Sequence, residues 1–235
     1  MRRPAVARAF SVGVVILAAG RSARMGKPKL LLPWRGTSVL GHLIQQWRAL
    51  RARQITVVCA PANRAIQAEL DRLGFPAENR IYNPTPERGM FGSIQCAARW
   101  PGWQTALTHW AIVLGDQPHL QPQTLRRVLD FSAAQPAKVC QPARHGQGRH
   151  PVLLPQTQFR QLAGSTAATL KEFLAARPPE VTFCEVDDPG LEVDIDRPED
   201  YHKAVELAAK RRGERDRPLP SCFKCQSWTS KLQLD

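Results

Sequence analysis

Short apolar segments typical of strands alternate with helical segments along this chain, and that alternation constrains its fold more than any other feature. The first segment, 12–18, is a continuous apolar run rich in β-branched residues, which is typical of a strand covered on both faces. We predict strands at 12–18, 55–60, 81–82, 110–114, 138–141, 151–154, 181–186 and 191–195. We predict helices at 38–52, 62–73, 93–100, 123–134, 167–176 and from 196 to about 210. Such alternation predicts an α/β fold with three layers, in which helices cover both faces of a mostly parallel sheet.

The 235 residues are enough for one domain with its own core, without a disulfide or a metal to support it. We expect that domain over residues 10–210, with a short basic leader at 1–9 and a basic, disordered tail at 211–235. The apolar run from Val12 follows two arginines, as in a secretory signal peptide. Cleavage after the run would destroy the structured motif that follows it, so we interpret the run as a strand.

Lysine and arginine outnumber aspartate and glutamate by 33 to 20, which gives a net charge of +13. Part of the excess lies at the two ends, where basic residues are more often solvated than bound to nucleic acid. The remainder suits an anionic small molecule as partner. No pattern of interleaved aromatic and basic residues marks a nucleic-acid platform, and no uncharged apolar run approaches the roughly 18 residues of a membrane span. We therefore expect neither nucleic acid nor a membrane as partner.

Six cysteines occur, mostly inside apolar strand-like runs. Their low density is unlike that of a disulfide-rich secreted protein and favours the reducing cytoplasm. Cys222 and Cys225 form a C-x-x-C pair in the polar tail. Because one pair supplies only two of the four ligands of a structural zinc site, free thiols are the preferred interpretation.

Three loops follow predicted strands, at 19–32, 83–93 and 115–118. In sheets of this kind ligands bind beyond the carboxyl ends of the strands, so chemistry is expected in these loops. The first loop has small residues that let the backbone approach a ligand closely. Its N–H groups, together with Arg24 and Lys29, suit phosphate oxygens.

This first loop matches neither of two common phosphate-binding motifs. Five residues separate Gly20 from Gly26, and a proline follows Lys27, which excludes a Walker loop. Ser22 and Met25 stand where the second and third glycines of a dinucleotide-binding fingerprint belong. Judged on composition alone, a basic loop that binds no ligand is as good an interpretation as a phosphate-binding loop.

The loop does resemble a family motif. Residues 17–29 read L-A-A-G-R-S-A-R-M-G-K-P-K, are followed by L-L-P at 31–33, and resemble the corresponding segment of MobA-like nucleotidyltransferases. Within that family the similarity is greatest to the molybdenum cofactor cytidylyltransferases. Four further blocks occur in the family's order, at Asn83 with 89–93, at 114–118, at 142–151 and at 193–200.

The resemblance implies a Rossmann-like sheet of the nucleotide-diphospho-sugar transferase type. It implies transfer of CMP from CTP to a phosphorylated acceptor, molybdenum-bound molybdopterin above all, with release of pyrophosphate. A magnesium ion is the implied cofactor, with manganese as an alternative. The implied partners are small-molecule substrates and a molybdoenzyme, and the implied assembly is a monomer or a weak oligomer.

The resemblance also implies roles for individual residues. Lys29, Arg24 and Asp116 are the expected catalytic residues, with Lys29 stabilising charge on the α-phosphate and Arg24 facing the departing pyrophosphate. Asp116, Asp194 and Asp196 are the expected metal ligands, since Mg²⁺ prefers carboxylate and phosphate oxygens. The expected nucleotide-binding residues are Leu17, Ala18, Ala19, Gly20, Ser22, Arg24, Lys29, Asn83 and Ser93. The expected acceptor-binding residues are Gln117 and His150.

Some of these residues have structural alternatives. Asp116 could cap a helix, and so could Asp196, which directly precedes the last predicted helix. Asp194 and Asp196 lie two apart on a predicted strand and so face the same side, and we favour Asp194 as the metal ligand by a small margin. His150 could equally be a structural residue that is hydrogen-bonded within its loop instead of an acceptor-binding residue.

Two places depart from the family pattern. Arg149 occupies the usual glycine before His-Pro, and 164–169 lacks the Asp and Arg often found there, so acceptor contacts from these places are not carried over. At 18–20 the chain resembles cytidylyl relatives, which carry Ala-Ala-Gly, more than guanylyl relatives, which carry Ala-Gly-Gly. The resemblance implies that the Ala19 methyl narrows the pocket toward the smaller pyrimidine base, a preference of about 1–3 kcal/mol. The open alternatives are GTP as donor, a sugar or polyol phosphate as acceptor, and a non-catalytic carrier of the pterin cofactor. Lys29, Asp116 and Asp194 argue against the carrier, because a carrier has no need for a metal at the triphosphate.

Overall fold

The chain folds into alternating strands and helices, and the computed structural model describes residues 9–20 and 28–210. The strands are β1 (Val12–Leu17), β2 (Pro33–Trp34), β3 (Thr37–Ser38), β4 (Gln54–Cys59), β5 (Arg80–Tyr82), β6 (His109–Leu114), β7 (Val139–Arg144), β8 (Gln147–Gly148), β9 (Val152–Pro155) and β10 (Val181–Glu185). The α-helices are α1 (Val39–Ala49), α2 (Arg64–Arg72), α3 (Gly89–Arg99), α4 (Pro122–Ala134), α5 (Gln156–Leu162), α6 (Leu170–Ala175) and α7 (Pro198–Lys210). Short 3₁₀ helices lie at Lys29–Leu31, Ala77–Asn79, Pro86–Arg88, Pro178–Glu180 and Pro189–Glu192.

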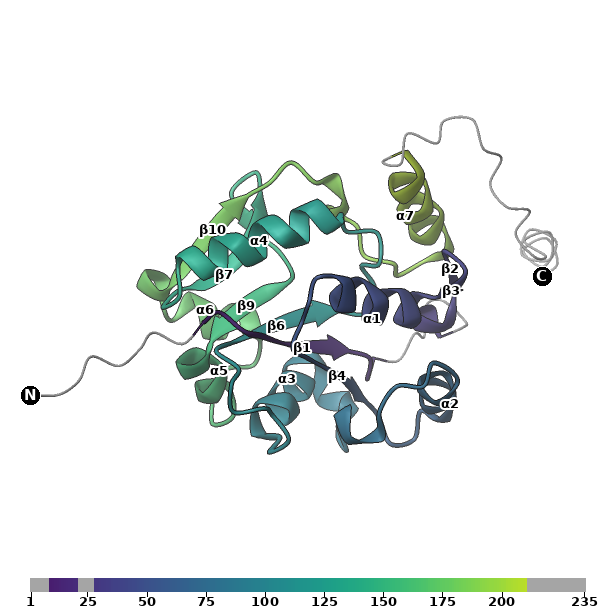
Figure 1. Cartoon of the computed structure of the whole chain (residues 1–235), viewed down its shortest axis with the longest axis horizontal. Coiled ribbons are helices and arrows are strands. Elements are labelled where there is room, and N and C mark those ends of the chain that lie inside the picture. The colour runs from purple at the N-terminus through teal and green to yellow at the C-terminus, as the bar shows by residue number, and fades with distance from the viewer. Residues whose placement is uncertain (1–8, 21–27, 211–235) are drawn as a thin grey trace, which may run out of the picture.

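The central strands run parallel. Strand β1 lies between β4 and β6 and is parallel to both, and the sheet has the order β10-β7-β9-β6-β1-β4-β5, with β8 paired to β7 (Figure 1). Strand β9 is antiparallel to β6 and β7. Two short strands, β2 and β3, form a separate antiparallel hairpin. The predicted mostly parallel sheet is therefore confirmed.

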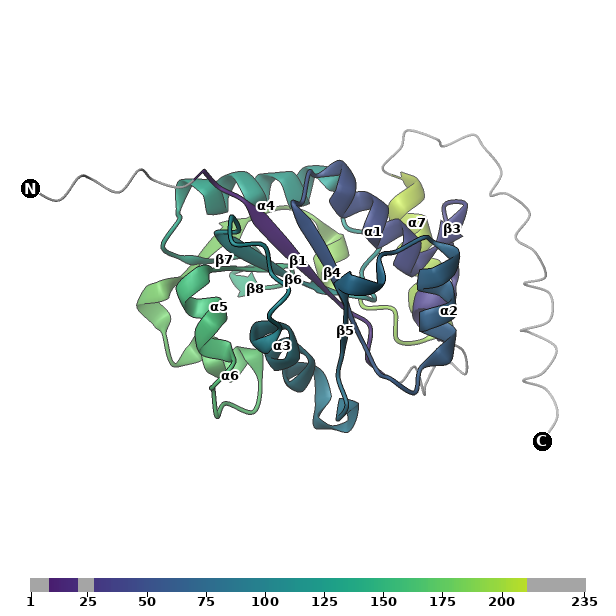
Figure 2. The same cartoon turned by 60° about the horizontal axis from the view of Figure 1, so that its bottom comes forward.

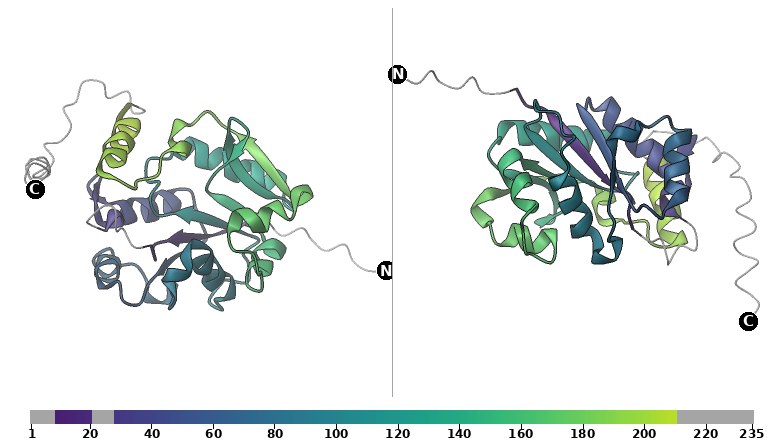
Figure 3. Two further views of the ribbon diagram at one scale, coloured as in Figure 1. Left: turned by 180° about the vertical axis from the view of Figure 1, so that it is seen from behind. Right: turned by 90° about the horizontal axis from the view of Figure 1, so that it is seen from below.

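Successive residues of β1 alternate between two hydrophobic cores. Val14 and Ile16 pack with residues of α1, α2, α4 and α7, whereas Val15 packs with residues of α3, α5 and α6. Figure 2 shows α1 and α4 above the sheet and α3, α5 and α6 below it, and the view from below in Figure 3 shows the same layers. Because both faces are covered, the central strands read as continuous apolar runs. The predicted three-layer α/β architecture is confirmed.

Two predicted helices begin three or more residues away from their expected first residues. The helix predicted at 93–100 begins four residues earlier, as α3, so part of the expected 83–93 loop is helical. The helix predicted at 167–176 begins at Leu170, because the Thr169 side chain accepts a hydrogen bond from the Glu172 backbone N–H and caps it.

The strand predicted at 191–195 is wrong. Residues Pro189–Glu192 form a 3₁₀ helix, and the backbone N–H of Ile195 donates to the carbonyl oxygen of Asp116 at 3.2 Å rather than to a neighbouring strand. Leu191, Val193 and Ile195 are buried in the core, which explains their alternating pattern without a strand. Asp194 and Asp196 therefore do not lie on a strand.

No helix among the described residues is long and apolar enough to cross a membrane. The described cysteines are free thiols, and burial raises the pKa of Cys59 and Cys140 to about 11, so both stay protonated. The expected tail at 211–235, with its C-x-x-C pair, lies outside the described residues, as does the expected leader up to residue 8.

Candidate functional site

The site lies at the carboxyl ends of the parallel strands. Leu17, the last residue of β1, is in register with Leu114, the last residue of β6, so the loops that follow these two strands begin side by side. The first of those loops leads to Lys29, and the second begins with Gly115 and Asp116. Two segments far apart in sequence thus meet at one edge of the sheet.

Gly115 allows this close approach. A Cβ atom at this position would lie 2.5 Å from the carbonyl oxygen of Leu17 and 2.7 Å from Cδ2 of Leu30. Leu30 is buried and anchors the short 3₁₀ helix that begins with Lys29. The absence of a side chain at Gly115 therefore lets Asp116 lie against Lys29.

Lys29 lies between two carboxylates. Its Nζ atom is 2.6 Å from Oδ2 of Asp116 and 3.1 Å from Oδ1 of Asp196. Burial alone would lower the pKa of Lys29, but the charges and hydrogen bonds of Asp116 and Asp196 outweigh it and raise that pKa above 10.5. The ammonium is therefore fully protonated at neutral pH.

Asp194 has a different partner. Its Oδ1 atom accepts a hydrogen bond of 2.8 Å from Nε2 of Gln117, a residue of the turn after β6. Partial desolvation raises the pKa of Asp194, whose side chain still reaches solvent, and the negative charges of Asp116 and Asp196 raise it further. Negative charge is therefore concentrated between the turn after β6 and the 194–196 segment.

The structure tests whether Asp116 and Asp196 cap the helices that follow them. Helix α4 begins at Pro122, well after Asp116, so Asp116 does not cap it. The Asp200 carboxylate accepts from the backbone N–H groups of Asp196 at 3.2 Å and Arg197 at 2.9 Å. Asp200, which the sequence reading did not select, holds this turn while the Asp196 side chain contacts Lys29.

Asn83, which directly follows β5, lies against Ser93 of α3. Nδ2 of Asn83 donates to Oγ of Ser93 at 3.0 Å, and Oδ1 of Asn83 accepts from the backbone N–H of Thr85 at 2.9 Å. Both Asn83 and Ser93 are buried. The pair organises the loop after β5, and direct contact with a nucleotide stays a prediction for both.

His150 is fixed through one ring nitrogen. Its Nδ1 atom lies 3.3 Å from the carbonyl oxygen of Ile112, which can only accept, so Nδ1 carries the proton and Nε2 is the acceptor of the neutral ring. Burial lowers the pKa of His150, which keeps the ring neutral, although the Ile112 hydrogen bond and the Asp116 charge act in the opposite direction.

A buried carboxylate joins the segments that carry the aspartates. Asp188 is fully buried and accepts from Oγ1 of Thr124 at 2.8 Å and from the backbone N–H groups of Gly190 at 2.9 Å and Gln121 at 3.2 Å. His119, also buried, donates from Nε2 to the carbonyl oxygen of Gly190 at 2.9 Å. Sequence reading missed this connection, whose only signal is an acidic pair at 187–188 before a proline.

The donor set fits a divalent cation that is shared with a ligand. Among the described residues no group of three or more His, Cys, Asp or Glu side chains is placed to hold a metal ion unaided. Oδ1 of Asp116, however, is buried without a hydrogen-bond partner. The carboxylates of Asp116 and Asp196 contact Lys29, and that of Asp194 interacts with their charges. Mg²⁺ is commonly held by one or two carboxylates plus substrate phosphates, so these residues fit that role.

The remaining predicted residues divide between described and undescribed parts. Leu17, Ala18, Ala19 and Gly20 lie at the end of β1, with Ala18 and Ala19 buried and Gly20 exposed. Ser22 and Arg24 lie outside the described residues.

Comparisons with known proteins identify the family of this chain. A family model described as MobA-like NTP transferase domain matches residues 14–182. The molybdenum cofactor cytidylyltransferase of Escherichia coli is 25% identical over 197 residues, which cover 83% of this chain and 96% of that protein. The bifunctional protein GlmU of Pseudomonas fluorescens is 34% identical over 124 residues, which cover 51% of this chain. That match spans only 25% of the length of GlmU.

Solved structures share the fold. The crystal structure of Rv0371c from Mycobacterium tuberculosis has a TM-score of 0.67 and 28% identity, covering 84% of this chain and 99% of that one. A manganese complex of the same protein has a TM-score of 0.62 and 26% identity, with the same coverage. The sheet and its helices are therefore arranged as in these solved structures.

Proposed function

The chain belongs to the MobA-like NTP transferase family, and on that premise we propose that it transfers CMP from CTP to a phosphorylated acceptor and releases pyrophosphate. The proposed acceptor is molybdenum-bound molybdopterin, the proposed metal is magnesium or else manganese, and the proposed compartment is the cytoplasm. The observation that carries the proposal is the position of Lys29 between the carboxylates of Asp116 and Asp196.

The reaction needs charge neutralisation and positioning rather than a covalent intermediate. An oxygen of the acceptor phosphate attacks the α-phosphorus of the triphosphate and forms a new P–O bond. The bond from the α-phosphorus to the oxygen that bridges to the β-phosphate breaks, and its electron pair leaves with pyrophosphate. Because both reactants are anions, positive charge in a fixed place lowers the barrier.

Lys29 is the cation that the described residues supply. Its raised pKa keeps the ammonium charged, and Asp116 and Asp196 hold Nζ at the carboxyl end of β1. A donor that is already in place costs no reorganisation when charge develops on the α-phosphate. Arg24, outside the described residues, is the proposed counterpart for the departing pyrophosphate.

Asp116, with Asp194 and Asp196, would hold the metal, and the unpartnered Oδ1 of Asp116 is the atom best suited to it. A bound divalent cation would supply further positive charge next to the triphosphate. Gln117 positions Asp194 through its 2.8 Å hydrogen bond. Asp200 positions Asp196 by bonding the backbone of its turn.

The base is proposed to contact the end of β1 and the loop that Asn83 and Ser93 organise. Ala19 is 6% exposed, and we propose that its methyl group forms part of the wall of the base pocket. A smaller pyrimidine fits such a wall better than a purine, and one methyl group discriminates by about 1–3 kcal/mol. This supports CTP over GTP.

His150 and Gln117 are the proposed contacts for the acceptor. The neutral His150 ring presents Nε2 as a hydrogen-bond acceptor. Oε1 of Gln117 is likewise a buried acceptor without a partner. Two acceptor atoms suit N–H donors of a heterocycle such as a pterin better than they suit a phosphate.

Pyrophosphate release measured with each of the four NTPs against candidate acceptors tests the proposal. The acceptors are molybdenum-bound molybdopterin, a sugar phosphate and a polyol phosphate, each assayed with Mg²⁺, with Mn²⁺ and with a chelator. We expect release with CTP and the pterin acceptor, and background release from the Lys29→Ala variant. Activity with GTP alone would overturn the choice of nucleotide, and activity only with another phosphate would overturn the acceptor. Tight pterin binding without release under any condition would establish the carrier instead.

A further inference from the structure

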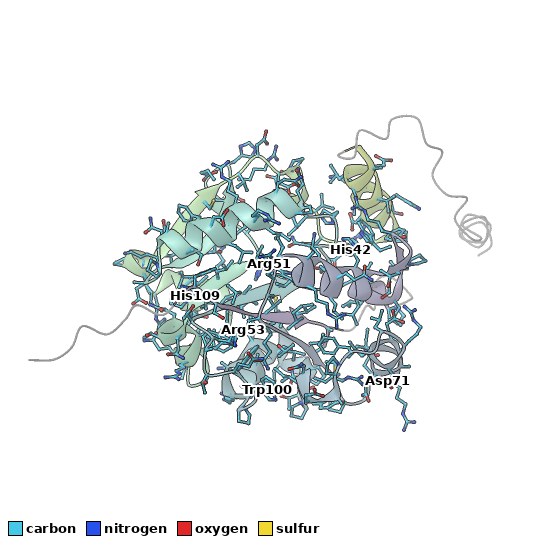
Figure 4. All side chains as sticks on the ribbon, in the orientation of Figure 1. His42, Arg51, Arg53, Asp71, Trp100 and His109 are labelled. Atoms are coloured by element: carbon cyan, nitrogen blue, oxygen red, sulfur yellow. The ribbon has the colours of Figure 1, made fainter. Side chains whose placement is uncertain are left out.

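A pocket lies at the amino ends of the central strands, at the opposite edge of the sheet from the site described above. Its volume is about 730 Å³, and it is lined by the residues that lead into β1, the end of α1, the segment before β6 and one side of α4. Figure 4 shows Arg51 and Arg53 beside the end of α1 that faces α4. A volume between roughly 300 and 1,000 Å³ is usual for a small-molecule site.

The charged residues of this pocket are mostly positive. Arg51, Arg53 and Arg126 line it together with one acidic residue, Asp130. Nε of Arg53 donates to Oε1 of Gln104 at 3.1 Å, which orients that guanidinium. No hydrogen bond or ion pair within the described part of the chain engages the side chains of Arg51 and Arg126. Guanidinium groups bind phosphate and carboxylate in a bidentate manner, so the pocket suits an anion.

The rest of the lining is mostly apolar, and two of its residues have buried polar atoms without a hydrogen-bond partner. Phe10, Trp47, Leu50 and Leu129 contribute apolar surface. Trp47 is 1% exposed, and its Nε1 atom is buried without a hydrogen-bond partner, although a buried indole N–H usually has one. Oγ of Ser11, which also lines the pocket, is buried without a partner as well.

The end of helix α1 does not oppose an anion here. The backbone N–H groups of Leu50, Arg51 and Ala52 donate to the last carbonyl oxygens of the helix, at 3.1, 2.9 and 3.1 Å. Arg51 adopts a left-handed conformation, with φ of 60°, which turns the chain and makes these bonds. Three of the last four carbonyl oxygens of α1 therefore have backbone partners, which reduces the partial negative charge that an anion would meet.

We infer that this pocket is a second ligand site, which binds a small organic anion: a phosphate or carboxylate attached to an aromatic or otherwise apolar body. The arginines bind the anionic group, and the partly buried side chains of Phe10, Leu50 and Leu129 accept the apolar part. Residues 1–8, which precede the lining residue Ala9 in sequence, carry three arginines and no acid, so their charge matches the pocket's instead of complementing it. The inference is independent of the proposed function, because no residue is shared between the two sites.

Titration with matched probes tests this inference. The probes are 1-naphthyl phosphate, 1-naphthoate, the neutral 1-naphthalenemethanol and inorganic phosphate, each titrated calorimetrically into the full chain. We expect one naphthyl anion to bind per chain, at least tenfold more tightly than either the neutral probe or inorganic phosphate. Comparison of the phosphate with the carboxylate identifies the preferred anion.

Variants locate the bound probe. Replacing both Arg51 and Arg126 with Gln, or filling the pocket with Ala106→Trp, is expected to weaken binding at least tenfold. Arg160→Gln, an exposed arginine of α5 on the other face of the sheet, is the matched control and leaves binding within twofold. Saturation with CTP and Mg²⁺, or the Lys29→Gln substitution, leaves binding unchanged.

Two results would overturn the inference. Equal affinity in the double-arginine and Ala106→Trp variants would show that the probe binds elsewhere. Displacement by CTP, or loss of binding in Lys29→Gln, would place the probe in the candidate active site instead.

Discussion

Lys29 and Asp116 are 87 residues apart in sequence, yet Nζ of one lies 2.6 Å from Oδ2 of the other, with both side chains largely shielded from solvent. The pair joins the loop after β1 to the turn after β6, two strands that are paired in register up to their last residues. Asp196 completes the arrangement from a third segment, at 3.1 Å from the same Nζ atom. The following predictions depend on this junction.

Lys29→Ala and Asp116→Ala are each expected to lower the rate of pyrophosphate release by at least a factor on the order of 10²–10³, because each removes a charge that is in place before reaction. The fold should survive, since the core lies on either side of the sheet and not at this edge. Circular dichroism and turnover measured on the same samples check both points. Lys171→Ala, an exposed lysine of α6, is the control. Turnover near that of the unmodified chain in either variant would remove the assigned role.

Gly115→Ala is expected to destabilise the chain by about 1–3 kcal/mol and to reduce turnover, because the added methyl overlaps the Leu17 carbonyl oxygen and Leu30. The turn must shift, and Asp116 shifts with it. Urea unfolding and pyrophosphate release measure the two effects. Gly164→Ala is the matched control, since its added methyl meets no atom within 4 Å. Unchanged turnover in Gly115→Ala would show that the position of Asp116 is not critical.

Asp188→Asn is expected to cost about 1–3 kcal/mol of unfolding free energy, because one of the amide's two polar atoms cannot accept a hydrogen bond and a buried donor loses its partner. Turnover should fall as well, since Asp188 holds the turn before Asp194. Asp187→Asn is the matched control, as the neighbouring side chain is 94% exposed. Equal stability of the two variants would show that the buried carboxylate does not hold these segments together.

Asp194→Asn is expected to raise stability near neutral pH while lowering turnover. Because the folded state raises the pKa of Asp194 above its ordinary value of 3.8, keeping that carboxylate ionised costs stability as pH rises through the folded pKa. The variant's advantage should be largest at pH 7.5 and shrink as pH falls toward 3.8. Urea unfolding at a series of pH values measures this, with the exposed Glu199→Gln as control. An advantage that does not change with pH would contradict the cause given for the raised pKa.

Ala19→Gly is expected to lower the ratio of kcat/KM for CTP to that for GTP by roughly 10–200-fold, the range expected for one methyl group in a pocket. The mechanism is the added volume beside the end of β1, where Ala19 is 6% exposed. Ala18→Gly, at a fully buried position next to it, should reduce stability without changing the ratio. A ratio that is unchanged in Ala19→Gly would mean that base selection lies elsewhere.

Local sequence determined the central part of the fold. Runs such as 12–18 and 110–114 are apolar throughout, and only a strand covered on both faces accommodates such a run between helices. The same reasoning failed at 191–195, because alternating apolar residues pack into a core with or without a neighbouring strand. It also missed α5, whose seven residues directly follow the proline that ends β9.

The sequence by itself also determined which residue types gather in the three loops after the strands, because strand order and direction bring those loops to one edge. Only the tertiary structure decided the pairings: Lys29 with Asp116 and Asp196, and Asp194 with Gln117. Those pairings depend on backbone positions that are set by distant contacts, such as the approach of Gly115 to Leu17 and the bond from Ile195 to Asp116. Contacts between residues far apart in sequence leave no local pattern, which is why the sequence predicts the members of the site but not their partners.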